Sequence, residues 1–340
     1  MAFTSSNGFN PLEIYRSYPE QNPYDIQPPI FNLAPHREAE DHDTPELKKA
    51  VLDIARRTGI NVLRQMCGDF PFLLSYLDEE IVTNNPVPFT QYQPPPPLAK
   101  IDLPDDVEFI RQINEAGNTP IFEVKVEGNT WLLKMFPAFG PVPEGYRTSR
   151  RPLDESNRPL DPVRRLMRER EAYAHLKQAG LCEQGHVPDC YGWTELRQVH
   201  VDAIAQVIPG LTYEDGQNIE DLLDKAYDGL FPKGILLEYF PDAQVMSIHN
   251  VTYDLGEKAV RSLYAIHAAH VLHGNVRRRN ILLLPDGRVV WIDFDSSLCA
   301  SDPQLRRLDL YLELQGGWSV FFRQLIPNKR IGWEWDVMFR

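Results

Sequence analysis

The sequence has few of the features that would place a protein outside the cell or in a membrane. Four cysteines in 340 residues are too few for a disulfide framework in a chain of this size. The N-terminus, MAFTSSNGFNPLEIY, has no basic flank followed by an apolar core, so a secretory signal is not expected. No apolar run approaches the roughly 20 residues that cross a bilayer. These absences predict a reducing, cytoplasmic location, with the nucleus not excluded.

Positive charge is also scarce. Lys and Arg number 35 against 48 Asp and Glu, which gives a net charge of −13. Because such a chain repels phosphate backbones and anionic lipids, neither nucleic acid nor membrane is an expected partner. Cys182, His186 and Cys190 match no common zinc spacing, and no second ligand pair follows them, so they do not predict a metal site.

Proline is distributed unevenly and divides the chain. Of the 29 prolines, 14 fall in the first 100 residues. Residues 1–43 are expected to be extended and disordered, and residues 44–83 to form a helical extension with Thr44 as its N-cap and Pro45 at its first position. The run QPPPP within residues 84–104 predicts a stiff linker, with recruitment of a proline-binding protein as the alternative.

From residue 105 the sequence has the pattern of a folded domain. VEFIRQI, IFEVKVEG and TWLLKMF predict strands, and EGN predicts a hairpin turn between the last two. A helix over VRRLMREREAYAHLKQAG precedes strands at HVPDCYGWTEL and GILLEYF. YDLGEKAVRSLYAIHAAHVL and DPQLRRLDLYLELQGGWSVFFRQLIP are predicted helices. This order predicts an α+β fold with two lobes, at about 105–240 and about 241–340.

The stretch VLHGNVRRRNILLLPDGRVVWIDFD, beginning at Val271, carries the most specific spacing. Asn280 follows Asn275 by five residues and precedes Asp293 by thirteen, with the turn PDG between them. This stretch resembles the catalytic core of the protein kinase-like superfamily, and most of all the divergent kinase-like proteins of fungi. The resemblance covers about residues 105–315. It implies a bilobal protein kinase-like fold, with an antiparallel sheet and one helix in the N-lobe and a truncated, mainly helical C-lobe.

The resemblance implies a site for ATP and Mg²⁺. Asn280 and Asp293 would hold the metal, since amide and carboxylate oxygens suit Mg²⁺. Lys134, on a predicted strand, would reach the nucleotide phosphates. Its partner would be Glu169, whose place three residues before AY fits the motif. Glu171, two residues further on, is the alternative partner.

The other implied nucleotide contacts have weaker signals in the sequence. Gly117 is the only glycine in NEAGNTP, the loop that would cover the phosphates, where the family pattern has several. Backbone groups from Glu238 to Phe240 in LLEYF would hydrogen-bond the adenine. His273 would pack beneath the Asp-Phe pair as a structural residue.

Several departures from the family pattern bear on catalysis. Asn275 stands where the family has its catalytic aspartate, and an amide is not a base near neutral pH. Asp295 turns the family's DFG into DFD, and only 45 residues follow it. An arginine of the same loop, such as Arg277, would either neutralise a transferring phosphate or belong to a solvated basic loop.

The expected function is therefore an ATP- and Mg²⁺-dependent phosphotransferase, slow or specialised, whose acceptor is a small molecule or a restricted protein partner. The first alternative is a nucleotide-binding pseudokinase that acts as a scaffold or allosteric partner. The second is an interaction protein that binds no nucleotide. Retention of the lysine, the helix glutamate and both metal ligands counts against the second alternative.

Overall fold

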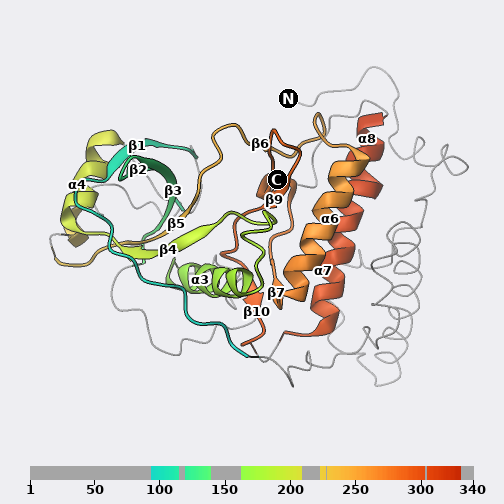
Figure 1. Ribbon diagram of the computed structural model, residues 1–340, viewed down its shortest axis with the longest axis horizontal. Coiled ribbons are helices and arrows are strands. Elements are labelled where there is room, and N and C mark those ends of the chain that lie inside the picture. Colours follow the sequence, from blue (N-terminus) through green and yellow to red (C-terminus); the bar gives the residue numbers. More distant parts are fainter. Residues whose placement is uncertain are drawn as a thin grey trace, which may run out of the picture.

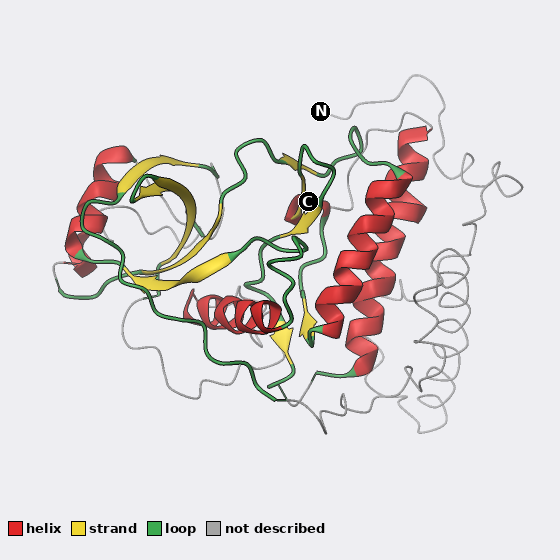
Figure 2. Ribbon diagram, in the orientation of Figure 1, coloured by secondary structure: helices red, strands yellow, loops and turns green. Residues whose placement is uncertain are grey.

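The computed structural model describes residues 93–114, 119–138, 162–208, 223–226, 228–302 and 305–330. In this part of the chain the protein is α+β, with five α-helices and a mostly antiparallel sheet. Figure 1 and Figure 2 show how these elements are arranged. The α+β class predicted from the sequence is confirmed. The predicted segments 1–43 and 44–83, and Gly117, lie outside the described residues.

Five antiparallel strands form the main sheet, in the order β1-β2-β3-β5-β4. Their bounds are β1 Glu108–Gln112, β2 Ile121–Val126, β3 Asn129–Phe136, β4 Cys190–Glu195 and β5 Lys233–Glu238. The β2–β3 hairpin turns at Glu127 and Gly128, whose φ angles of 49° and 84° are both positive. Two such residues give the tight turn whose twist matches that of the flanking strands.

Helices cover both faces of this sheet. Leu133 and Met135 lie in an apolar cluster that includes residues of α4 (Gln198–Val207). Since successive side chains of a strand point to opposite faces, Lys134 points the other way, where α3 (Pro162–Gln178) packs. The alternation in LLKMF thus places a buried lysine between the sheet and a helix.

The described residues after β5 form a second half of the structure, which is mainly helical. α6 (Tyr253–Ala268) packs against α7 (Arg307–Ser319), and these helices stand together at the right of Figure 1. α7 continues through a π-helical segment, η4 (Val320–Leu325), into α8 (Ile326–Arg330). Thr252 caps α6, because its Oγ1 accepts a hydrogen bond of 3.2 Å from a backbone amide of the first turn.

Short strands connect the two halves. β8 (Ile281–Leu283) and β9 (Val289–Trp291) form a hairpin over the turn PDG, with β6 (Gln244–Val245) beside β8. β7 (Val271–Leu272) pairs with β10 (Leu298–Cys299). These pairings bring the loop that precedes β8 close to the loop that follows β9.

Residues 93–104, called here the N-terminal strap, lie along the edge strand β4. The Ile101 amide donates to the Trp193 carbonyl at 2.8 Å, and the Trp193 amide donates back to the strap at 3.0 Å. Leu98 and Leu103 of the strap are buried. The strap therefore covers an edge that would otherwise present unpaired backbone groups. This part of the predicted linker lies on the sheet, while the predicted domain boundaries stay predictions.

One apolar core joins the two halves. It contains Phe136 of β3 and Leu176 of α3 together with Val260 of α6, Trp291 of β9 and Phe322 of η4. Among the described helices, none is both long and apolar enough to cross a bilayer.

Candidate functional site

Lys134 is the centre of a buried ionic cluster between β3, α3 and the loop after β9. Its Nζ lies 2.6 Å from Glu169 Oε2 and 2.6 Å from Asp293 Oδ1. The side chains are 5% exposed for Lys134, 0% for Glu169 and 29% for Asp293. Lys134 thus joins a helix carboxylate to a loop carboxylate, and only the second is open to solvent. Glu171, the alternative partner, accepts a hydrogen bond from Ser301 instead.

Asp295 adds a third carboxylate to the cluster. Arg165 of α3 donates to its Oδ2 from Nε at 2.8 Å and from Nη2 at 2.5 Å. Ser296 Oγ donates to the other oxygen at 3.0 Å, and Lys134 Nζ lies 3.9 Å away. The residue that departs from the family's DFG pattern therefore fixes the loop to α3.

The charges of the cluster perturb one another. Burial alone would lower the pKa of Lys134, but the three carboxylates around it raise that pKa above its ordinary value. Burial raises the pKa of Glu169 to about 7, against the opposing effect of the Lys134 ammonium. Burial would also raise the pKa of Asp295, yet the Lys134 and Arg165 cations lower it to about 2. The pKa of each group in the cluster therefore depends on the charges of the other groups.

Asn275, Asn280 and Asp293 meet where the two loops touch. Asn275 Nδ2 donates to Asp293 Oδ2 at 3.3 Å. Asn280 is the last residue of the short 3₁₀ helix η3 (Arg278–Asn280), and its Nδ2 donates to the Asn275 carbonyl at 2.8 Å. Asp293 has a φ of 71°, in the left-handed region that non-glycine residues seldom adopt. Both Asp293 oxygens thus have partners within the protein, and Asn275 is one of them.

A carboxylate of α7 holds the start of the same loop. Glu313 accepts hydrogen bonds from the backbone amides of His273 at 2.8 Å and Gly274 at 2.6 Å. Gly274 has a φ of 78°, and a Cβ there would lie 2.1 Å from the Ser296 carbonyl oxygen. Only glycine fits this contact. His273 is fully buried, with its ring 4.7 Å from that of Phe294, so its surroundings are those of a structural residue.

The remaining predicted site residues lie around this cluster. Glu238 ends β5, and its Oε2 accepts a hydrogen bond of 3.1 Å from the Asp189 amide. Phe240, two residues later, is half-buried with the Arg288 guanidinium 6.0 Å from its ring centre. Arg277 is half-buried immediately before η3. The nucleotide contacts assigned to Glu238 and Phe240 and the phosphate-neutralising role assigned to Arg277 stay predictions, as do the roles of the central residues.

Two residues of the site were not predicted. Arg165 lies one helical turn before Glu169, so the i, i+4 spacing of RRLMRE was a signal that both side chains share one face of α3. Glu313 gave no local signal, because its hydrogen bonds bridge 39 and 40 residues of sequence. Both residues anchor the loops rather than extend the predicted chemistry.

The ion pairs of this cluster connect the two halves of the described chain. Lys134, Glu169 and Arg165 belong to the sheet and its helix, whereas Asp293 and Asp295 belong to the loop after β9. Two cations and three carboxylates attract one another across this boundary. Asn275 offers no group that could accept a proton near neutral pH. We call these five charged residues the ionic clamp.

A search of curated proteins gives no match to the chain. The family described as "Kinetochore Sim4 complex subunit FTA2" matches residues 88–297. This finding overturns the identification as a protein kinase-like protein, and with it the phosphotransferase function, which is wrong. The spacing of Lys134, Glu169, Asn280 and Asp293 is compatible with strands and loops packed around an ionic clamp, and such a spacing does not by itself specify a reaction. Because the match covers more than half of the chain's 340 residues, the chain belongs to the kinetochore Sim4 complex subunit FTA2 family.

Proposed function

We propose that the chain is a non-enzymatic, protein-binding subunit of a kinetochore complex. The observation that carries this proposal is the family match over residues 88–297, which contains the sheet, α3 and the whole ionic clamp. A subunit of this kind works by presenting fixed surfaces. The buried charges support that role because they hold loops in place.

The proposed role implies partners and a compartment. Kinetochores assemble on chromosomes, so the nucleus replaces the cytoplasm as the expected location. With a net charge of −13 the chain would be repelled by a DNA backbone. We therefore infer that it joins the assembly through proteins. The proposed partners are other subunits of the complex named in the family description.

The two halves of the molecule suit a scaffold. We infer that the sheet with α3 and α4 forms one lobe and the α6–α8 region the other, in a bilobal body. The shared apolar core and the ionic clamp both cross between the lobes, which supports a rigid relation between them. Surfaces on both lobes would then face partners at a constant spacing.

The experiment that tests this proposal is affinity purification of the tagged full-length chain from cells that express it, with crosslinking before lysis. Recovery of other Sim4 complex subunits, and a fluorescent fusion that marks kinetochores, are the expected results. Lys134→Met should reduce recovery because it loosens the clamp, whereas Lys125→Met, an exposed lysine of β2, should not. A diffuse cytoplasmic signal without any of those subunits would overturn the proposal.

The proposal that the chain is not an enzyme is tested separately. Purified chain with ATP and Mg²⁺ should release no more phosphate than the Asp293→Ala variant does. A Mg²⁺-dependent rate that Asp293→Ala abolishes would contradict this part alone. Binding of ATP and Mg²⁺ without turnover, followed as a shift in melting temperature, would bear only on the predicted cofactors.

A further inference from the structure

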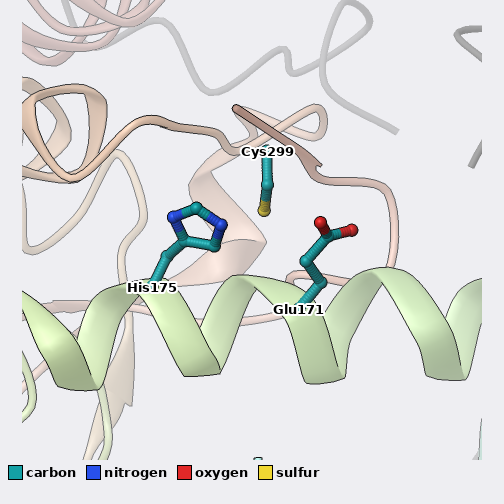
Figure 3. A group of neighbouring side chains, drawn as sticks. All are labelled: Glu171, His175 and Cys299. Carbon is teal, nitrogen blue, oxygen red and sulfur yellow. The ribbon is translucent and has the colours of Figure 1, made fainter. Parts of the chain in front are cut away.

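Three side chains of types that can ligate a metal meet on the side of α3 away from the ionic clamp. Glu171 and His175 are four residues apart on α3, so they lie on one face of the helix. Cys299 of β10 lies opposite them, and Figure 3 shows its sulfur facing both side chains. One ligand atom from each residue lies within 4.8 Å of the other two. The described residues contain no other group of three such side chains this close.

The three side chains need to move only a little to bring their ligand atoms within bonding distance of one ion. Zinc bonds of about 2.0–2.3 Å place tetrahedral ligand atoms about 3.3–3.8 Å apart. The side chains therefore have to approach by about 1 Å, which small rotations provide. Helix α3 and strand β10 already pack together, so no backbone change is needed.

The position of His175 suits a metal ligand. His175 is buried on α3, with its ring in the group of three. Its ring also hydrogen-bonds the Ala269 backbone, and Figure 3 shows one ring nitrogen pointing towards Cys299 and the other away. A ring that donates one N–H to a backbone carbonyl presents its other nitrogen as a lone pair, the arrangement found at metal-ligating histidines.

We propose that Glu171, His175 and Cys299 form a Zn²⁺ site. Thiolate, imidazole and carboxylate are ligands that Zn²⁺ accepts together, and water completes the tetrahedron. When the ion binds, the Cys299 thiol loses its proton to solvent and a sulfur–metal bond forms. Ser301, which donates a hydrogen bond to Glu171, holds the carboxylate beside the site.

The net charge of the surrounding side chains favours a divalent cation. Asp302 and Arg168 both act electrostatically on Glu171 and Cys299, with opposite signs. Glu171, Asp302 and a Cys299 thiolate carry three negative charges, and Arg168 carries one positive charge. A Zn²⁺ ion therefore brings the group to neutrality. The bound ion would join β10 to α3. This proposal does not rest on the proposed function.

The test is a titration of the purified, metal-free full chain with Co²⁺, followed by competition with Zn²⁺. One Co²⁺ per chain should give a thiolate-to-metal charge-transfer band in the near ultraviolet, and Zn²⁺ should abolish it. Cys299→Ser should remove the band. Glu171→Gln, at a half-buried position, should keep the fold and weaken Zn²⁺ binding by at least about 10-fold, since loss of even an outer-shell partner has that effect.

Cys182→Ser is the matched control, because Cys182 is a buried free thiol outside the cluster and its loss should leave both the band and the affinity unchanged. Absence of a thiolate band in the native chain would overturn the proposal. So would a band that survives Cys299→Ser, or Zn²⁺ binding that Glu171→Gln leaves intact, since the ion would then bind elsewhere in the chain.

Discussion

At the scale of single residues, Lys134 is the side chain on which the buried charges depend. Lys134→Met would keep much of the apolar stem but leave the carboxylates of Glu169, Asp293 and Asp295 without their shared cation. Breaking a buried pair by removing one partner costs about 3–5 kcal/mol, because the other charge stays buried and uncompensated. We expect a loss of this size in the free energy of unfolding, measured by urea denaturation.

Lys125→Met, on the exposed side of β2, is the matched control and should change that free energy by no more than about 0.5 kcal/mol. Equal effects at the two positions would mean that the contacts of Lys134 are not sustained in solution. A smaller loss with Lys134→Met would show that protonation of Glu169, whose pKa burial raises to about 7, relieves part of the repulsion.

Asp295 makes the stability depend on pH. Its pKa falls from 3.8 to about 2 in the folded chain. A carboxyl with a depressed folded pKa stabilises the protein above its unfolded pKa and loses that contribution as the pH falls through the folded value. Asp295→Asn should therefore cost about 2 kcal/mol at neutral pH, and the difference between variant and native chain should shrink steadily from about pH 4 to about pH 2.

Urea midpoints measured at several pH values test this expectation. Asp286→Asn is a useful comparison, because Asp286 is paired with Arg288 on the surface and such pairs contribute little. A cost of Asp295→Asn that stays constant with pH would show that the carboxylate acts through shape or hydrogen bonding rather than charge.

At the scale of elements, the N-terminal strap is an unexpected part of the sheet. Leu103 is 2% exposed in the apolar cluster beneath β1 and β2. Leu103→Ala should cost about 2–5 kcal/mol by removing buried methyl groups and leaving a cavity. Asp102→Ala, at the exposed neighbouring position, should be nearly neutral. Thermal or urea unfolding of the full chain would reveal a strap that does not pack if both variants behave alike.

Local patterns were sufficient for most strands and helices of the described part. The alternation in IFEVKVEG and the turn at Glu127 and Gly128 are short-range features, and so is Gly180 after α3. Helix α4 was not expected, because VHVDAIAQV is rich in residues that also favour strands. The prolines of the strap predict a linker, because nothing in the local sequence indicates its pairing with the β4 edge about 90 residues away.

The candidate site was predictable only where partners are fixed by local geometry. Glu169 was identified by its place on a helix face, but the pairing of Arg165 with Asp295 spans 130 residues and has no short-range pattern. The predicted phosphotransferase function is wrong because it rested on local spacing of the same kind. A lysine, a glutamate and an Asn–Asp spacing describe how a strand, a helix and two loops meet, and such packing can serve a structural clamp as well as a reaction.

At the scale of the whole molecule, the described residues should unfold as one cooperative unit. The apolar core extends from Phe136 of the sheet to Phe322 near the C-terminal helices, and the ionic clamp crosses the same boundary. Lys134→Met removes the centre of the clamp but leaves the Arg165–Asp295 pair and this core in place. It should therefore lower the stability without separating the halves.

Hydrogen exchange during urea denaturation measures this directly, with one peptide from β2–β3 and one from α6 as reporters. Both peptides should lose protection at the same urea concentration in the native chain, and at a lower shared concentration in Lys134→Met. Earlier exchange of α6 than of β2–β3 in the native chain would contradict a single unit. Earlier exchange only in the variant would assign the cooperativity to the clamp, because the apolar core would then be too weak to hold the two halves together without the buried lysine.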